Sequence, residues 1–364
     1  MAVDPRSLAW AMLAHKRLPQ RALVTLLREF GNPGVILDAS LAELARHVPS
    51  TSAAAVCEPV PAAALEAAKR WLDDPAHHLI AWDDADYPRS LLDIGHAPPV
   101  LFFIGARHLL TRPAFAIVGS RHATQQGKAN ARDFANALAL AGLTIVSGLA
   151  LGVDAAAHEG ALPTEASTLA FIGTGPDRIY PARNRDLARR IAETGGIVSE
   201  FVPGTPARPE NFPRRNRLIS GVSRGVLVVE ATLSSGSLIT ARWAGEQGRD
   251  VFAIPGSIHS PFARGCHKLI REGAKLVETA EDILAELGLG ATEPRAPARA
   301  QRAPGERAWL LDTLGYDPVT VDAIVERTGH AADVVAAGLV RLELEDLVDA
   351  LPGGYWQRRA NRST

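Results

Sequence analysis

The 364-residue sequence is poor in the residues that build disulfide frameworks, zinc sites and membrane spans. Its only two cysteines, Cys57 and Cys266, lie far apart and belong to no C-x-x-C motif, which argues against a disulfide scaffold and a zinc site. No apolar run is long enough to cross a bilayer, and the N-terminal segment lacks the pattern of a signal peptide. We therefore expect a cytoplasmic protein that binds no metal and no membrane.

An excess of charge of either sign is also missing, because the formal net charge is −1. The charge is nevertheless unevenly placed: residues 178–224 contain ten arginines, no lysine and four acidic residues. Three of these arginines, Arg214, Arg215 and Arg217, lie together in the peptide NFPRRNRLISG at residues 211–221. Guanidinium groups donate several hydrogen bonds in a fixed geometry that suits phosphate. A local basic patch therefore indicates a nucleic acid as partner, although a run of charge is usually just a solvated face.

The sequence pattern divides the chain into four parts. Residues 1–75 carry periodic leucine and alanine, which predicts a small helical domain of the SAM or helix-hairpin-helix type. Residues 76–288 alternate short apolar runs with helical stretches, and residues 289–305 are rich in Pro, Ala and Arg, as linkers are. Residues 306–364 predict three short helices and a hairpin, which together suggest a winged-helix module.

Six apolar runs in the second part predict strands. Helical stretches separate them, so we expect βαβ crossovers and an α/β fold with a doubly wound, mostly parallel sheet that helices cover on both faces. The runs are FAIV at 115–118, LTIV at 143–146, TLAFI at 168–172, GIVS at 196–199, VLVV at 226–229 and VFAI at 251–254.

Small and polar residues follow several of these runs, at the sheet edge where doubly wound folds bind their ligands. Glycines there let the backbone approach an anion, a helix start favours phosphate, and Arg121 adds a planar fork of donors. Alternatively, the glycines only form tight turns and Arg121 pairs with a structural carboxylate. The ligand contacts expected from these segments are Gly119, Ser120, Arg121, Ser147, Gly148, Gly152, Glu230, Ser235, Gly236 and Ser237.

The arginine-rich peptide is expected to run into a helix before the VLVV run and to reach the same sheet edge. We expect Arg214, Arg215, Asn216 and Arg217 to line that edge together with Arg121. A basic groove with aromatic platforms holds a single strand without sequence preference. Two aromatic residues beside the basic patch are therefore candidates for base stacking, with a place in the core as the alternative: Phe212 and Tyr180.

Catalytic machinery is not expected. Asp154 and His158 are four residues apart and could share a helix face, but Asp154 stands where a helix cap belongs and His158 lacks any second ligand or partner motif. No serine has an obvious His and Asp partner in the sequence. The residues thus give no support for a catalytic site, and they indicate no cofactor.

Several motifs follow one another with a recognisable order and spacing. They are GSR at 119–121, SGLALGVDAAAH at 147–158, GTGPDRIYPARN at 173–184, NFPRRNRLISG at 211–221, EATLSSGSLITARWAGEQGRDVFAIPG at 230–256 and RGCHKLIREGA at 264–274. Over about residues 80–285 the chain closely resembles the DNA-processing protein A family, also called DprA or Smf.

This resemblance implies an extended Rossmann domain that binds single-stranded DNA, dimerises and loads the RecA recombinase onto incoming strands during natural transformation. It also implies that Arg121 grips a DNA phosphate and that the FPRRNR stretch forms a basic wall. The main alternative is a Rossmann-type nucleoside monophosphate hydrolase. Such hydrolases carry a PGGxGTxxE run, and the corresponding stretch here, SSGSLITAR, has no glutamate at that offset.

The predicted third helix of the winged-helix module has a charge that is unusual for a helix that reads DNA. Residues 331–346 contain four acidic residues and a single arginine, Arg341. Phosphate would repel such a helix, so we expect the module to contact protein, either the chain's own basic groove or a partner.

Overall fold

The computed structural model describes residues 3–16, 18–289, 308–315 and 317–359. These residues form two compact units, one made of most residues up to Leu289 and one that contains the C-terminal residues. The predicted linker lies outside the described residues, apart from Leu289. Among the helices described, none is both long and apolar enough to cross a membrane.

The first unit begins with a cluster of helices. Several of them start at a side chain that accepts the free N–H groups of the first turn, such as Asp4 and Asn32, and Ser40 forms a capping box with Glu43. Their apolar faces enclose a core around the buried Trp10 and pack against the first two strands of the sheet. The helices are α1 (Pro5–His15), α2 (Gln20–Phe30), α3 (Pro33–Asp38), α4 (Leu41–Leu44), α5 (Ser50–Cys57) and α6 (Ala62–Leu72).

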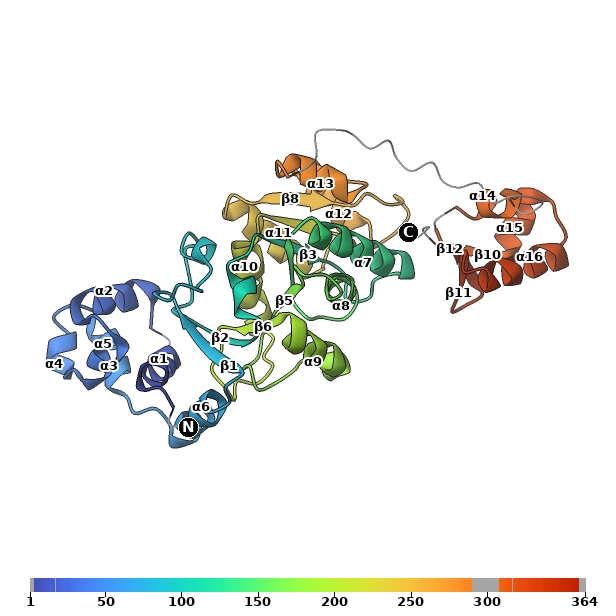
Figure 1. Ribbon diagram of the computed structural model, residues 1–364. Helices are drawn as coiled ribbons and strands as arrows, with labels where there is room; N and C mark the ends of the chain where they lie inside the picture. The colour runs from blue at the N-terminus through green and yellow to red at the C-terminus, as the bar shows by residue number, and fades with distance from the viewer. Residues whose placement is uncertain (1–2, 17, 290–307, 316, 360–364) are drawn as a thin grey trace. The chain divides into compact units, whose positions relative to one another are not determined.

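A nine-stranded sheet runs through the first unit in the order β1-β2-β6-β5-β4-β3-β7-β8-β9 (Figure 1). Only the β1–β2 and β2–β6 pairs are antiparallel. The strands are β1 (His77–Ala81), β2 (Val100–Gly105), β3 (Ala114–Val118), β4 (Thr144–Ser147), β5 (Thr168–Phe171), β6 (Gly196–Ser199), β7 (Gly225–Val228), β8 (Asp250–Ala253) and β9 (Lys275–Leu276). The doubly wound, mostly parallel sheet predicted from the sequence is thereby confirmed, and all six predicted runs form strands.

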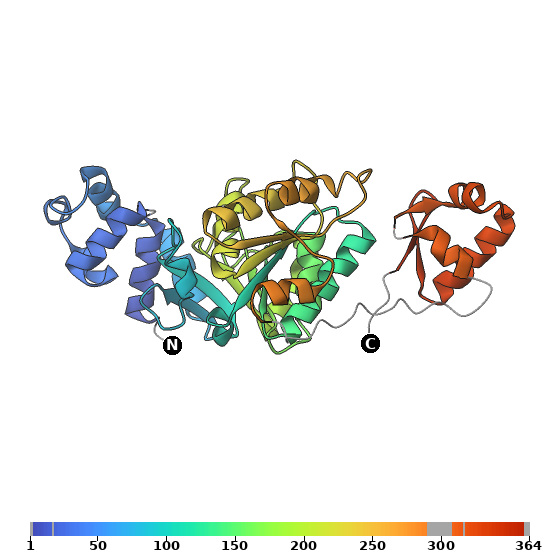
Figure 2. The same ribbon diagram turned by 90° about the horizontal axis from the view of Figure 1, so that it is seen from above.

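Helices cover both faces of this sheet (Figure 2), because alternate residues of each strand point to opposite sides. In β3, Phe115 and Ile117 face one helical layer while Ala116 and Val118 face the other. The first layer contains α7 (Gln125–Leu140), α8 (Val153–Ala161), α9 (Arg185–Thr194) and α13 (Ala280–Glu286). The second contains α10 (Asn211–Val222), α11 (Ser237–Glu246) and α12 (Arg264–Arg271). Three short 3-10 turns, η1 (Arg89–Leu91), η2 (Arg107–Leu110) and η3 (Ala182–Asn184), lie in the connections.

The strand order reverses between β3 and β7. From β3 the chain adds β4, β5 and β6 on one side, and it then returns to place β7, β8 and β9 on the other. The loops that follow β3 and β7 therefore diverge at the carboxyl edge of the sheet, which is where ligands bind in this fold class.

The second unit is a winged-helix fold, as predicted. Three helices enclose a core that includes Ile324 and Leu339, and a small sheet in the order β10-β12-β11 closes it. The helices are α14 (Ala308–Leu314), α15 (Val321–Thr328) and α16 (Ala332–Leu344); the strands are β10 (Val319–Thr320), β11 (Val348–Leu351) and β12 (Tyr355–Arg358).

Candidate functional site

A cavity of about 600 Å³ opens at the point where the strand order reverses. Its walls come from the loop after β3, the segment between β7 and α11, and the first turns of α8 and α10. The predicted contact residues that line it are Gly119, Ser120, Arg121, Phe212, Tyr180, Arg215, Asn216, Ser235, Gly236 and Ser237.

Backbone hydrogen bonds fix the loop after β3 on two sides. The Ser120 N–H donates to the Glu230 carbonyl at 2.7 Å, and the Ser120 carbonyl accepts the Val153 N–H at 3.2 Å. A Cβ on Gly119 would lie 2.6 Å from Val153 Cγ2, so this position needs glycine. Glu230 thus holds the loop through its backbone, and the loop presents the exposed Arg121 beside the cavity.

The loop between β4 and α8 has a different role from the one expected for some of its residues. Gly152 has a φ of +79°, and a Cβ there would clash with the Ser120 carbonyl oxygen. Ser147 is fully buried and donates from Oγ to the Ile117 carbonyl at 2.6 Å. The expectation that Ser147 contacts a ligand is therefore wrong in this geometry: its hydroxyl joins β4 to β3.

Arg215 is buried behind the cavity, with only 5% of its surface exposed. Its Nη1 donates to the Gly148 carbonyl at 2.6 Å and also to the Phe171 carbonyl. A Cβ on Gly148 would lie 2.5 Å from this nitrogen, which explains the glycine. Burial lowers the pKa of Arg215 to about 10, and the nearby Asp154 carboxylate opposes that shift. The guanidinium is therefore a positive charge that the fold holds in place.

Arg214 and Arg217 share one carboxylate oxygen of Glu200, the residue after β6. Arg217 Nη2 lies 2.5 Å and Arg214 Nη2 lies 3.0 Å from Glu200 Oε2. The side chains of Arg217 and Glu200 are 8% and 1% exposed, whereas that of Arg214 is 55% exposed. The expectation that all three arginines line one edge with Arg121 thus holds for Arg215 and fails for the other two: Arg214 and Arg217, three residues apart, lie together on another side of α10 and reach Glu200.

Arg121 lies over the ring of Phe212, with 5.8 Å between the guanidinium carbon and the ring centroid. The Tyr180 ring lies beside Phe212 at a centroid distance of 5.5 Å and remains 48% exposed. A smaller cavity of about 70 Å³ adjoins these three side chains and reaches Gly148. The cation and the two aromatic rings thus form one continuous surface.

The N-terminus of α11 forms the opposite wall. Ser235 and Ser237 join through their hydroxyl oxygens at 2.8 Å, and Asn216 Nδ2 donates to the Gly236 carbonyl at 3.4 Å. Open space surrounds the position that a Cβ on Gly236 would occupy. Because helix N-termini carry free N–H groups and a positive dipole end, this wall suits an anion.

The acidic and histidine residues of α8 serve the fold. Gly152, and not Asp154, occupies the helix cap; Asp154 instead accepts the N–H groups of Gly148 and Ala150 at 3.0 and 3.3 Å. Burial raises the pKa of Asp154, and Arg215 partly offsets the rise. Burial lowers the pKa of His158 to about 3, and its Nδ1 lies 2.7 Å from the Thr168 hydroxyl. His158 is therefore a neutral core residue.

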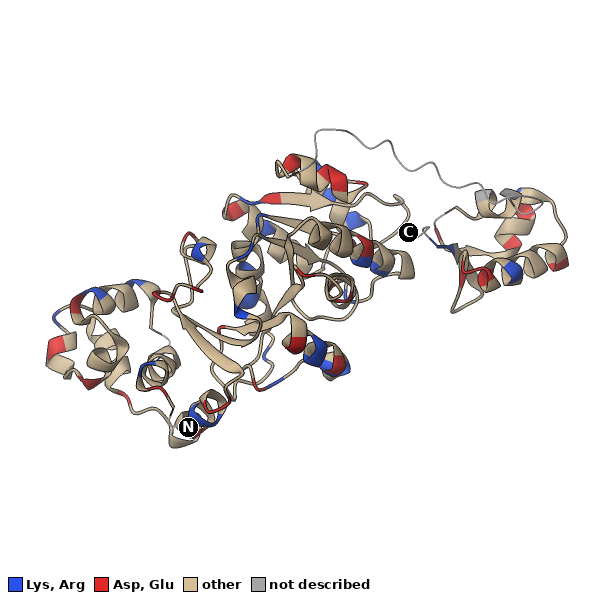
Figure 3. Ribbon diagram, in the orientation of Figure 1, with Lys and Arg blue, Asp and Glu red and all other residues tan. Residues whose placement is uncertain are grey.

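Sequence reasoning missed several residues that line the cavity. His122 directly follows the GSR motif, and its position at a strand end was the available signal. Thr232 lies between the predicted contacts Glu230 and Ser235, which was a similar signal; Phe262 also lines the cavity, but no spacing in the sequence connects it to the strand ends. Most of the exposed arginines of the basic stretch lie elsewhere, on and before α9, where Figure 3 shows blue segments between red ones. They are Arg178, Arg183, Arg185, Arg189 and Arg190.

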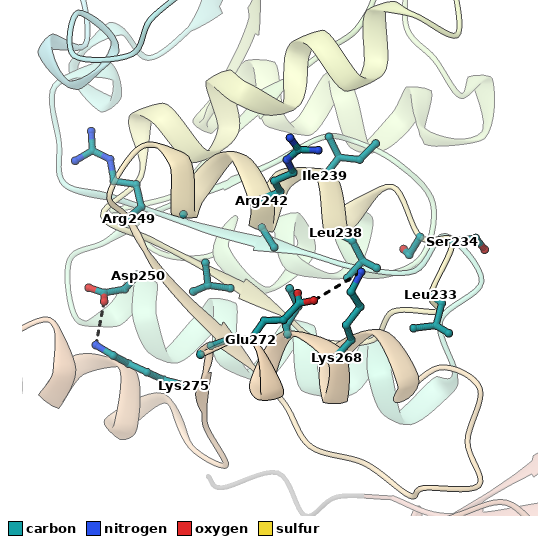
Figure 4. Close-up of a pocket in the computed structure, with 17 residues that line it drawn as sticks. Leu233, Ser234, Leu238, Ile239, Arg242, Arg249, Asp250, Lys268, Glu272 and Lys275 are labelled. Atoms are coloured by element: carbon teal, nitrogen blue, oxygen red, sulfur yellow. Dashed lines mark hydrogen bonds and ion pairs between the residues drawn. The ribbon is translucent and has the colours of Figure 1, made fainter.

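A second cavity, of about 770 Å³, lies between α11 and α12 (Figure 4). Its charged side chains are largely matched: Lys275 lies 2.9 Å from Asp250, and Lys268 lies 3.9 Å from Glu272. Mixed charge and an apolar lining that includes Leu238 give this cavity less preference for an anion than the first one has.

The fold and the first cavity together define a Rossmann-type α/β protein that carries a cationic and aromatic surface at its strand-reversal point, with a winged-helix unit after it. Residues 78–288 match the family model described as DNA recombination-mediator protein A, and residues 293–354 match the DprA winged helix domain. The chain belongs to the DNA recombination-mediator protein A family.

Similar proteins and solved structures support this family assignment. Protein Smf of Escherichia coli is 43% identical over 82% of this chain and 82% of its own length. DNA processing protein DprA of Streptococcus pneumoniae is 48% identical over 56% of this chain and 72% of its own length. The X-ray structure of DprA from S. pneumoniae covers 79% of this chain and 99% of its own at a TM-score of 0.67 and 37% identity. The chain therefore has a role in DNA processing related to recombination.

Proposed function

We propose that this protein binds single-stranded DNA without sequence preference and acts as a non-catalytic recombination mediator. In this role it protects incoming single strands and loads the RecA recombinase onto them during natural transformation, as a cytoplasmic homodimer that needs no cofactor. DNA processing protein A from Helicobacter pylori, a protein with a unique single-stranded DNA binding mode, has a structure that covers 58% of this chain and 95% of its own at a TM-score of 0.54 and 30% identity.

The observation that carries the proposal is the surface formed by Arg121, Phe212 and Tyr180 opposite the start of α11. A nucleotide has a charged phosphate and a flat base, and this surface offers a partner for each. Arg121 and the α11 N-terminus suit the phosphate, and the exposed Tyr180 ring suits the base. Stacking on an aromatic ring is possible for any base, which accounts for the absence of sequence preference.

Each of the four parts of the sequence has its own role in this proposal. In the proposal, residues 76–288 bind the strand, residues 1–75 form a helical domain beside it, and residues 289–305 link this part to the winged-helix module at residues 306–364. That module contacts protein in the proposal, so deletion of residues 306–364 is expected to leave single-strand affinity unchanged or raised. A large loss of affinity would contradict this assignment.

Fluorescence anisotropy with a labelled single strand and its duplex tests the binding proposal. Wild type is expected to prefer the single strand, and Arg121→Ala is expected to weaken binding to all base compositions alike. Arg132→Ala is the matched control, because Arg132 lies on α7 outside the cavity lining, has a side chain that is 41% exposed, and pairs with Glu159 at 2.9 Å. Equal affinities of wild type and Arg121→Ala would refute the site.

The alternative function, hydrolysis of nucleoside monophosphates, has a separate assay. The protein is incubated with each of the four monophosphates, and chromatography measures released base. Release that Arg121→Ala abolishes would replace the binding proposal with the hydrolase. RecA loading is tested by the rate of RecA filament assembly on a single strand; an unchanged rate with this protein present would remove the mediator role but leave DNA binding standing.

A further inference from the structure

The outward face of α16 is unlike that of a DNA-reading helix. The helix buries one side in the core of its unit and exposes the other. Winged-helix proteins that read DNA present basic side chains from this helix. Here Val334 and Val340 are 50% and 49% exposed, and Leu344 is 82% exposed. Three exposed aliphatic side chains on one short helix indicate a contact with protein.

The exposed residues of α16 lie in one stripe. Val334, Ala337, Arg341 and Leu344 follow one another at intervals of three, four and three residues, which keeps them on one side of a helix. Such spacing is typical of a helix that packs lengthwise against a second helix.

The outward face of α16, which includes the exposed Asp333 and Val340 beside this stripe, is symmetric about Ala337. Val334 and Val340 stand three residues before and after it, and Asp333 and Arg341 stand four residues before and after it. When two copies of α16 lie antiparallel with their Ala337 residues at the crossing, each Val334 faces Val340 of the other copy. Each Asp333 then faces Arg341 of the other copy, so the contact contains two ion pairs related by a two-fold axis.

We propose that α16 pairs with α16 of a second copy of this chain through this self-complementary face. In the described part of the chain neither Asp333 nor Arg341 forms an ion pair, so both charges are available to a second copy. Figure 3 shows the acidic ends of α16 with a basic segment between them. The small side chain of Ala337 lets the two helix axes approach closely.

The pairing is weak by itself and acts when other contacts bring copies together. A helix of 13 residues is about 20 Å long, so two such helices bury less surface than the roughly 1,200–2,000 Å² of a stable interface. Copies held close together have a high effective concentration, at which such a contact forms. The inference rests on α16 alone and does not depend on DNA binding.

Cysteine cross-linking of the full chain tests this geometry. Ala337→Cys, in a background in which the exposed Cys57 is replaced by serine, places two thiols face to face across the two-fold axis. Under mild oxidation it is expected to form disulfide-linked dimers at least about tenfold faster than Glu326→Cys, a control on the exposed surface of α15. Equal rates of the two variants would overturn the proposal.

Charge exchange separates pairing from a structural role. With Ala337→Cys present, either Asp333→Arg or Arg341→Asp places like charges opposite each other twice and is expected to slow cross-linking. The combination of both substitutions restores the two ion pairs and is expected to restore the rate. Loss of cross-linking in the combined variant, with an unchanged circular dichroism spectrum, would refute the arrangement.

The same variants distinguish this inference from DNA binding. Arg341→Asp is expected to leave anisotropy with a single strand and with a duplex unchanged. If it weakens either, this face contacts nucleic acid and the pairing is overturned. If wild type binds no DNA but Ala337→Cys still cross-links faster than the control, the proposed function fails and the inference stands.

Discussion

Replacement of Arg217 by alanine tests whether the arginines of the NFPRRNRLISG peptide serve the fold or a ligand. Arg217 Nη2 lies 2.5 Å from Glu200 Oε2, and both side chains are buried. Removal of one partner of a buried ion pair costs about 3–5 kcal/mol because the other charge stays buried. Arg214 still lies 3.0 Å from the same oxygen, so we expect the lower end, about 3 kcal/mol.

Thermal unfolding measures this cost. At roughly 2 °C per kcal/mol for a domain of this size, Arg217→Ala is expected to lower the Tm by about 6 °C. The double variant Arg217→Met with Glu200→Gln removes both charges and is expected to recover part of the loss. Because Arg217 is buried, the salt dependence of DNA binding is expected to stay as in wild type.

Arg121→Ala is the comparison variant for Arg217→Ala, because Arg121 is exposed beside the cavity whereas Arg217 is buried. Its Tm is expected to equal that of wild type. Loss of one phosphate contact makes the slope of log K against log salt less negative by about 0.7 for a single strand. The reasoning is refuted if Arg217→Ala keeps the wild-type Tm and loses salt dependence, since Arg217 would then contact DNA.

Three further outcomes follow from the geometry. Gly152→Ala places a Cβ against the Ser120 carbonyl at a φ of +79° and is expected to cost more than about 1 kcal/mol in urea unfolding; an unchanged midpoint would contradict the strain. His158 has a pKa of about 3 in the fold against 6.5 in the unfolded chain, so the unfolded chain takes up its proton first and stability falls as the pH drops below 6.5. His158→Gln is expected to remove the contribution of His158 to this pH dependence. That contribution is a slope of about 1.4 kcal/mol per pH unit in the free energy of unfolding between the two pKa values, and identical slopes in variant and wild type would disprove it. Tyr180→Ala leaves the buried face of Phe212 in place and is expected to lose about 1–3 kcal/mol of single-strand affinity for every base, as measured by anisotropy; a loss confined to one base would indicate direct readout instead.

The strands of the parallel sheet could be predicted because each is a short apolar run bounded by small residues, as strands buried on both faces are. The antiparallel strands β1 and β2 are absent from the predicted runs, although β2 contains the apolar run VLFFI between a proline and a glycine and could have been predicted by the same rule. β1 begins with His77 and His78, which interrupt the apolar pattern, and nothing local in the sequence indicates that β2 pairs with β6. An apolar run predicts that a strand exists more reliably than it predicts which strand lies next to it in the sheet.

The residues of the candidate site could also be predicted only in part. Gly119 and Arg121 could be predicted because the carboxyl ends of strands meet at one edge. The directions of Arg214, Arg215 and Arg217 could not, because successive residues of a helix point about 100° apart while a charge count treats them as one group. The contact of Tyr180 with Phe212 joins residues far apart in the sequence, and only the folded chain brings the two rings together.

The antiparallel pair β1–β2 connects the helical domain to the wall of the cavity. β2 carries that domain on one side and pairs with β6 on the other. The residue after β6 is Glu200, which anchors α10 through Arg214 and Arg217. Backbone pairing and one shared carboxylate therefore connect the helical domain to the helix that carries Phe212. Truncation of the chain before β2 would remove β1 and the helices that cover Phe102, and would expose this fully buried ring.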